Sequence, residues 1–171
     1  MAVLDILHYP DPRLKQTSVP VESFDEALRM FVADLEETMR AGPGGVGIAA
    51  PQVGRFERIV IIDVSSKPKI KQHGRLVLIN PEILAWEGMV KGREGCMSVP
   101  DFTGNVIRAE SVRLSAQDEQ GDSREFEMDG FEARAVQHEI DHLDGILFID
   151  RISVLKRSIY KKKLAKALKN Q

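Results

Sequence analysis

The chain lacks several features that would assign it to a specialised class of protein. Its 171 residues include a single cysteine, so no disulfide can form within the chain and nothing requires an oxidising compartment. No apolar run approaches the roughly 20 residues that span a bilayer. The first five residues contain neither the basic nor the apolar segment of a secretory signal. We therefore expect a cytoplasmic protein with no membrane partner.

Aromatic residues are also scarce, at 6% of the chain, but 43% apolar and 29% charged residues are typical of a globular protein. A chain of this length usually forms one domain. The net charge of −2 is unevenly distributed, because residues 151–171 carry +8 and the preceding 150 residues carry −10. Such a basic tail suits either contact with a polyanion or a solvated terminal helix.

Hydrophobic periodicity and turn residues predict a helix, then several strands, then another helix. The first helix is predicted from Ser23, as its N-cap, to about Arg40, where a glycine-rich stretch ends it. Strands are predicted over 58–64, 76–80, 82–91, 111–117 and 124–128, and helices over 130–143 and in the basic tail. Because helices and strands do not alternate, this order indicates an α+β fold.

The most informative stretch is His138-Glu139-Ile140-Asp141-His142. Helix positions four apart lie on one face with Cβ atoms about 5–6 Å apart, which suits two ligands of one metal ion. Glu139, between them, can then reach a water held by the ion and act as a general base. The pattern is short, and a solvated helix with two surface histidines is the alternative that it leaves open.

A catalytic metal site with three protein ligands needs one more donor. The HExxH peptidases take it from a downstream Glu or His, but no Glu, His or Cys follows His142. His8 and His73 stand in contexts typical of solvated turns. Cys96, in a glycine-flanked stretch, is the best remaining donor, although a lone cysteine is more often a small buried apolar residue.

A third segment, residues 44–52, is rich in small residues and reads Gly-Gly-Val-Gly-Ile-Ala-Ala-Pro-Gln. It suits a flexible hinge after the first helix. It also suits a loop that presents backbone N–H and C=O groups to an extended substrate, with Gln52 as an amide donor. Glycine runs are common, so this segment alone does not decide between the two.

Together, the three segments resemble the peptide deformylase family. Its motifs, in chain order, are GxGxAAxQ, EGCxS and QHExDH, and this sequence has GVGIAAPQ at 45–52, EGCMS at 94–98 and QHEIDH at 137–142. The resemblance covers nearly the whole chain from Tyr9 onward. Met97 departs from the usual leucine, and Ile107 stands before Arg108 where proline is common.

The resemblance implies a single-domain fold of mostly antiparallel strands around a central helix that carries HEIDH. Residues 1–150 would form the metal-dependent deformylase domain, and residues 151–171 a basic C-terminal helix appended to it. The implied activity is hydrolysis of the formyl group from the N-terminal formyl-methionine of newly made polypeptides, with release of formate. The implied partners are N-formylmethionyl nascent peptides, with no sequence-specific nucleic-acid binding. In some members the C-terminal helix docks on the ribosome, which makes the ribosome a candidate partner here.

The resemblance also implies a role for each candidate site residue. The metal ligands would be Cys96, His138 and His142. Glu139 would move the proton, while the Gln52 side chain and the Met97 backbone N–H would stabilise negative charge on the formyl oxygen. Substrate binding is implied for Val46, Gly47 and Gly95, which would pair with the peptide backbone, and for Phe131 and Ala135, near the methionine side chain.

The implied cofactor is one divalent metal ion, Fe(II) in the cell, with zinc, nickel or cobalt in purified protein. A Cys/His₂ set also satisfies zinc, which lies above Fe(II) in the Irving–Williams order. Two rival functions remain. A zinc endopeptidase shares the HExxH chemistry but lacks its usual third ligand here. A non-catalytic module would use the same ligands structurally, although structural zinc sites normally have four.

Overall fold

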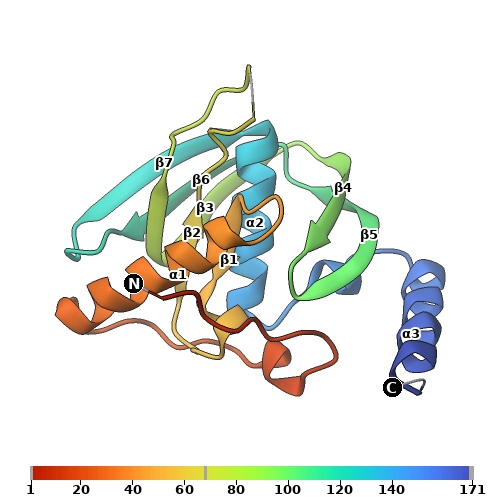
Figure 1. The fold of residues 1–171 in the computed structure, drawn as a ribbon. Coiled ribbons are helices and arrows are strands. Elements are labelled where there is room, and N and C mark those ends of the chain that lie inside the picture. The colour runs from red at the N-terminus through yellow and green to blue at the C-terminus, as the bar shows by residue number, and fades with distance from the viewer. Residues whose placement is uncertain (1, 68, 170–171) are drawn as a thin grey trace.

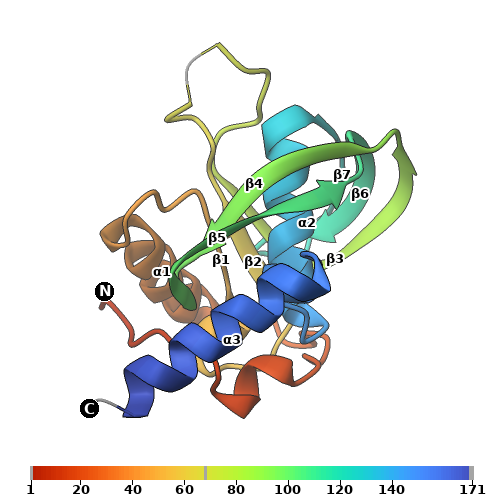
Figure 2. The same ribbon diagram turned by 90° about the vertical axis from the view of Figure 1, so that its right-hand side faces the viewer.

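The structure is a computed structural model that describes residues 2–67 and 69–169. Within these ranges the chain forms a five-stranded sheet, a two-stranded sheet and a helix, α2 (Gly130–Leu143), that lies between them (Figures 1 and 2). The predicted α+β class is confirmed, and so is the central helix that carries HEIDH. No helix in the described part of the chain is both long enough and apolar enough to cross a membrane.

Both sheets are antiparallel. The larger has the order β1-β2-β3-β6-β7, formed by β1 (Gly47–Ala49), β2 (Ile59–Ile62), β3 (Leu76–Glu87), β6 (Ser111–Gln117) and β7 (Ser123–Asp129). The smaller pairs β4 (Val90–Cys96) with β5 (Val99–Arg108). Among the described residues, β1 and β4 each have one edge without a partner strand.

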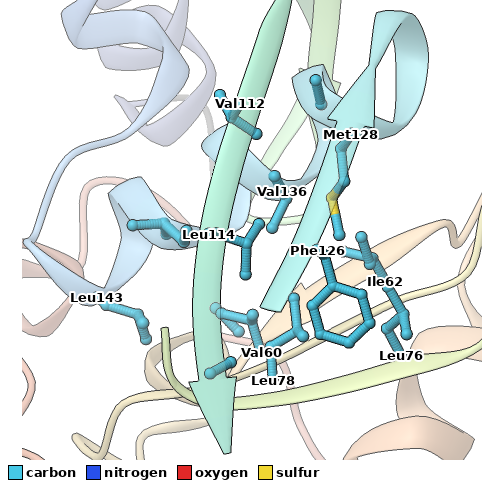
Figure 3. Close-up of a cluster of buried hydrophobic side chains, with 14 residues drawn as sticks. Val60, Ile62, Leu76, Leu78, Val112, Leu114, Phe126, Met128, Val136 and Leu143 are labelled. Carbon is cyan, nitrogen blue, oxygen red and sulfur yellow. The ribbon is translucent and has the colours of Figure 1, made fainter. Parts of the chain in front are cut away.

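Helices cover both faces of the larger sheet, and β2 shows why. Ile59 and Ile61 belong to the cluster that packs against α1 (Glu26–Ala41), whereas Val60 and Ile62 belong to the cluster that packs against α2. Successive strand residues point to opposite faces, so a strand covered on both sides is apolar throughout. Figure 3 shows the α2 side, where strand side chains surround Val136.

The element predictions succeeded for β6 and α2, whose bounds match, and came within one residue at each end of β7. The prediction of Ser23 as the first N-cap is wrong, because Asp25 caps α1 by accepting a hydrogen bond from the Leu28 N–H. The prediction of two separate strands over 76–80 and 82–91 is also wrong, because residues 76–87 form one strand. β3 continues across that gap through a register shift, and the chain turns at Gly88 instead.

Two strands, β1 and β5, were not predicted from the sequence, and the predicted strand 82–91 includes only the first two residues of β4. β1 lies inside the segment interpreted as a loop, and β5 follows the metal-ligand candidate Cys96. The basic tail forms α3 (Val154–Lys169), and residues 170–171 lie outside the described ranges. This helix lies at the periphery beside β5 (Figure 2), where Tyr160 stacks on Phe102 with ring centroids 4.4 Å apart. A division of the chain at residue 150 stays a prediction.

Gly145 provides a test of the turn that ends α2. Its φ is +74°, and an added Cβ would overlap the Lys15 backbone carbonyl. We expect Gly145→Ala to lower the free energy of unfolding by about 3 kcal/mol, measured by urea denaturation, because strain and a backbone clash add. Gly54→Ala is the matched control, since Gly54 has a φ of +82° but open space around its Cβ position, and about 1 kcal/mol is expected. If the two variants lost the same free energy of unfolding, the overlap with the Lys15 carbonyl would contribute nothing.

Candidate metal centre

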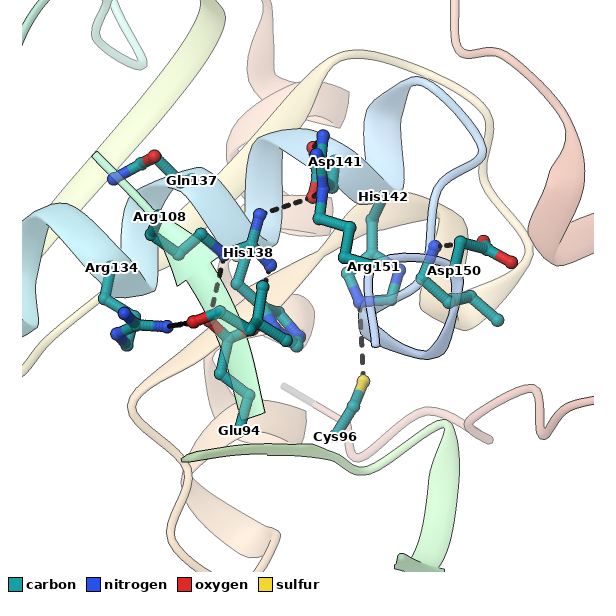
Figure 4. Close-up of polar contacts among 12 residues, drawn as sticks. Glu94, Cys96, Arg108, Arg134, Gln137, His138, Asp141, His142, Asp150 and Arg151 are labelled. Atoms are coloured by element: carbon teal, nitrogen blue, oxygen red, sulfur yellow. Dashed lines mark hydrogen bonds and ion pairs between the residues drawn. The ribbon is translucent and has the colours of Figure 1, made fainter. Parts of the chain in front are cut away.

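Three potential ligands converge where the end of β4 meets α2. His138 and His142 lie one turn apart on α2, with ring centroids separated by 5.2 Å. Cys96 is the last residue of β4, and its Sγ lies 3.4 Å from Nε2 of His142 (Figure 4). One donor atom from each of the three residues lies within 4.8 Å of the others. Residues from distant parts of the chain thus form a group able to hold a metal ion.

The spacing of these donors fits a tetrahedral ion. Sulfur and nitrogen ligands at about 2.3 and 2.0–2.1 Å from a tetrahedral metal are about 3.5 Å apart, close to the 3.4 Å between Cys96 and His142. The Nδ1 atom of His138 is hydrogen-bonded to Glu94 Oε1 at 2.9 Å, so its other ring nitrogen, Nε2, is left to face the centre. The donor set, a thiol and two imidazoles, is one that transition metals prefer.

Glu94 orients His138 and is itself held by two arginines. Arg108 donates to both of its carboxylate oxygens, at 2.8 and 2.9 Å, and Arg134 donates to Oε2 at 2.6 Å (Figure 4). Burial alone would raise the pKa of Glu94, but the hydrogen bonds and charges of Arg108 and His138 outweigh it and hold that pKa far below its usual value. Glu94 therefore stays ionised and accepts from the imidazole.

The same network continues along α2. Arg108 also donates to Asp141 at 2.6 Å, and Arg151 donates to both Asp141 oxygens, at 2.6 and 2.9 Å. Residues from β4, β5, α2 and the segment before α3 are thereby joined. The roles of Glu94, Arg108, Arg134, Asp141 and Arg151 were not predicted from the sequence. One signal was available, because Glu94 stands two residues before Cys96 and shares its face of a strand.

Glu139 lies beside the ligands in a buried and poorly solvated position. It is 6% exposed, and its Oε1 has no hydrogen-bond partner among the described residues. Burial is the main reason that its pKa is raised to about 7, with His138 acting in the opposite direction. A carboxyl group with such a pKa exchanges a proton readily near neutral pH.

The charges around the histidines favour a positive group in this centre. Burial opposes protonation of His138, but Glu139, Cys96 and Glu94 together raise its pKa well above the usual value. His142 behaves in the opposite way, because burial and the neighbouring His138 lower its pKa well below that value. The centre thus stabilises one positive charge, which either a proton on His138 or a bound cation supplies. A neutral His142 is the form that ligates metals.

Gln52, in the short 3₁₀ helix Ala50–Val53, is oriented with its amide nitrogen toward the centre. Its Oε1 accepts from the Ala49 N–H at 2.9 Å, and its Nε2 donates to Ser98 Oγ at 3.2 Å and lies 3.5 Å from Cys96 Sγ. These contacts fix which end of the amide faces the sulfur. Ser98 belongs to the EGCMS motif at 94–98, but the sequence does not predict its contact with Gln52.

A cavity of about 800 Å³ lies against this centre, between the open edges of β1 and β4. Of the predicted site residues, all except the almost fully buried His142 line it: Val46, Gly47, Gln52, Gly95, Cys96, Met97, Phe131, Ala135, His138 and Glu139. The structure therefore brings the candidates together, while their individual roles stay predictions.

The open edge of β1 approaches Glu139 closely at Gly47. An added Cβ there would lie 2.6 Å from Glu139 Oε2, so a side chain would displace the carboxylate. The Val46 carbonyl accepts from the Asp63 N–H at 2.8 Å on the β2 side. Strand groups alternate in direction, so the backbone of Gly47 rather than the Val46 carbonyl faces the open edge.

Of the two remaining histidines, His73 differs from the solvated turn predicted for it, whereas His8 is exposed as predicted. The His73 N–H and ring both bond to Glu132, at 2.7 and 2.6 Å, and the Glu132 side chain is almost fully buried. His73 thus anchors its loop to the start of α2. His8 is exposed but lines the cavity. Neither belongs to the group of three ligands.

Comparisons with known proteins agree with the motifs. The family model for polypeptide deformylase matches residues 3–158. A curated relative from Alkalilimnicola ehrlichii, named peptide deformylase, is 47% identical over 169 residues, which cover 99% of this chain and 93% of the relative.

Solved structures agree over a similar extent. A peptide deformylase from Legionella pneumophila gives a TM-score of 0.88 at 41% identity and covers 99% of this chain and 98% of its own. A peptide deformylase from Ehrlichia chaffeensis in complex with actinonin gives a TM-score of 0.90 at 36% identity and covers 98% of each chain. The fold, including the elements that carry the centre, is shared.

Arg108 offers a test of the buried network. Arg108→Leu should lower the free energy of unfolding by about 3–5 kcal/mol, because it leaves Glu94 and Asp141 buried with fewer charge partners. Arg29→Leu is the control, since the Arg29–Glu26 pair is largely exposed and less than about 1 kcal/mol is expected. Urea denaturation of both variants measures the difference. Similar losses would show that the network contributes little to stability.

Proposed function

The chain belongs to the peptide deformylase family, and from this premise we propose that it removes the N-formyl group from the N-terminal formyl-methionine of newly made polypeptides. The reaction breaks the C–N bond of the formamide with water and gives formate and a free amine. One observation carries the proposal: a thiol and two imidazoles converge beside a buried carboxyl group, in a cavity between two unpaired strand edges. We further propose a cytoplasmic location, where nascent chains are made.

Cys96, His138 and His142 would hold one divalent metal ion. We propose Fe(II) in the cell and zinc, nickel or cobalt in purified protein, because the donor set suits each of them. The ion supplies Lewis-acid chemistry, which lowers the pKa of water and polarises a carbonyl oxygen. Glu94 keeps the His138 ring oriented through Nδ1, and its own ionisation is maintained by Arg108 and Arg134.

Glu139 would carry the proton through the reaction. Its carboxylate accepts a proton from the attacking water and then delivers it to the leaving nitrogen. A pKa of about 7 serves both steps, since the group gains and loses a proton with similar ease near neutral pH. The neighbouring Gly47 leaves room for the carboxyl group to remain beside the substrate.

Gln52 and Met97 would stabilise the negative charge that grows on the formyl oxygen. The Gln52 Nε2 group is already oriented toward the centre by the contacts of its amide with Ala49 and Ser98. The Met97 backbone N–H, directly after Cys96, would be the second donor. Loss of one such donor typically costs about 3 kcal/mol of transition-state stabilisation.

The peptide would lie as an added strand in the cavity between β1 and β4. Gly47 and Gly95 would pair with its backbone, and Val46 would contact it beside them. Phe131 and Ala135, on α2, would surround the methionine side chain. Support comes from the cavity itself, which both strand edges and this face of α2 line together.

The decisive test uses protein purified anaerobically, with metal content measured alongside activity. It should hydrolyse formyl-Met-Ala, and Glu139→Gln should lower kcat by about 10²–10⁴-fold while metal content is unchanged, because the variant lacks a base but keeps the three ligands. Glu125→Gln, an exposed change on β7, is the control and should behave as the unmodified chain.

The same assay separates the rival functions. A zinc endopeptidase would cleave a blocked internal peptide, which the unmodified chain should leave intact. A non-catalytic metal module would show no deformylation. Full turnover by Glu139→Gln would overturn the assigned proton transfer.

We also propose that α3 contacts the ribosome through its lysines. No acidic residue lies between 151 and 171. The side chains of Lys161, Lys162 and Lys163 are exposed, whereas Tyr160 holds the helix against β5. Phosphate groups would attract such a surface, and the attraction would weaken steeply with salt.

Changing Lys161, Lys162 and Lys163 together to Gln should reduce co-sedimentation with ribosomes at low salt, because three phosphate contacts are lost. The slope of the logarithm of the binding constant against the logarithm of the salt concentration should also become shallower, by roughly 0.7–0.9 for each lost contact. Changing the same three residues to Arg preserves the charge and should preserve binding. Deletion from Lys156 onward is a harsher version, since it also removes Tyr160. Unchanged co-sedimentation after deletion would exclude this role for the tail.

A further inference from the structure

The two faces of β4 differ in character. Glu94 points toward α2, where it bonds to His138 and Arg134. Residues on either side of Glu94 in the strand must point the other way. Gly95 and Arg93 therefore share the face directed away from α2, and both line the cavity.

Arg93 differs from the other arginines near the centre. Arg108 and Arg134 are buried and bonded to carboxylates. Arg93 is exposed, and among the described residues it makes neither an ion pair nor a side-chain hydrogen bond. It is a permanently charged group at the cavity rim, able to bind a carboxylate with two donors.

No acidic residue of the cavity lining neutralises this end of the rim. Glu94 and Glu139 are buried in the centre. Asp101 is exposed, but it lies near the tip of the β4–β5 hairpin, four residues along β5 from Asn105, which is the residue paired with Arg93. The rim of the cavity is thus cationic along β4 and acidic near the hairpin tip.

We propose that Arg93 determines specificity by favouring formyl peptides that carry a carboxylate side chain at residue 2, at residue 4 or at both, with each position contributing to the preference. The inference rests on the proposed function, in which the peptide pairs with the β4 edge and its formyl end lies at Cys96. Residue 2 then lies opposite Gly95, and residue 4 lies opposite Arg93. Side chains directly or diagonally across a pair of strands are within reach of a long side chain.

The alternation of the peptide agrees with this assignment. If the methionine side chain points toward Phe131 and Ala135 on α2, residue 3 points the same way, and residues 2 and 4 point to the face of Arg93. The two assignments thus require one and the same register. The face toward α2 has its own cation, since Lys67 Nζ lies 5.1 Å from the centroid of the Phe131 ring. A test must therefore measure the part of any preference that depends on Arg93.

The experiment compares kcat/KM for C-terminally amidated formyl-methionyl tetrapeptides that carry Glu or Gln at residue 2, 3 or 4. At residues 2 and 4, kcat/KM for the Glu peptide should be about two to five times that for the Gln peptide, as expected for an exposed charge pair. In about 0.5 M salt this ratio should fall toward one, because salt screens exposed charges. Arg93→Ala should abolish the preference at residues 2 and 4. Arg93→Glu should reverse it, so that Lys is favoured over Glu.

Two controls make the result specific. The ratio at residue 3 should be the same with and without Arg93. Arg113→Ala removes an exposed strand arginine outside the cavity and should leave every ratio unchanged. Hydrolysis with ratios that do not respond to Arg93 would overturn this inference alone. No hydrolysis of any formyl peptide would overturn the proposed function, and this inference with it.

Discussion

The carboxylate of Glu94 is the interaction on which the rest of the centre depends. It joins β4, β5 and α2, because it accepts from Arg108 of β5 and from Arg134 and His138 of α2. Fixing one carboxylate therefore fixes the distance between the strand that ends at Cys96 and the helix that carries both histidines. Buried charges are tolerated here only because each has partners, and removal of one partner leaves another uncompensated.

The position of α2 between the two sheets explains why two unpaired strand edges border the cavity. α2 lies between the sheets, and its polar residues are engaged by the network on the β4 side, while its apolar residues pack on the larger sheet. β1 and β4 are left facing each other with unpaired edges. Gly47 permits β1 to approach Glu139, and Gly95 leaves the facing edge without a side chain. An extended peptide is the ligand whose backbone satisfies both edges at once.

The predictable parts of the molecule were those that local patterns encode. Continuous alternation in Ser111–Gln117 and helical spacing after Gly130 gave β6 and α2 with their observed bounds. β5 was missed because proline and glycine interrupt its pattern, and β1 because a strand of only three residues, Gly47–Ala49, carries almost no periodic signal. Motif spacing located the ligand candidates, but Glu94 and Arg108 are joined by pairing of β4 with β5, which no local pattern specifies.

The arginines on the two sides of β4 differ in whether their charges are compensated, because those on one side are buried among carboxylates and the one on the other side is exposed. On the side of β4 that faces α2, Arg108 and Arg134 bond to carboxylates, so their charges are already compensated, and they hold the Glu94 carboxylate that orients His138. On the outer face, Arg93 has no such partner in the described structure, so its charge remains available to whatever occupies the cavity. In the proposed function, Arg108 and Arg134 would thus help to position a metal ligand and Arg93 would select the substrate, and what distinguishes them is the side of β4 on which each lies.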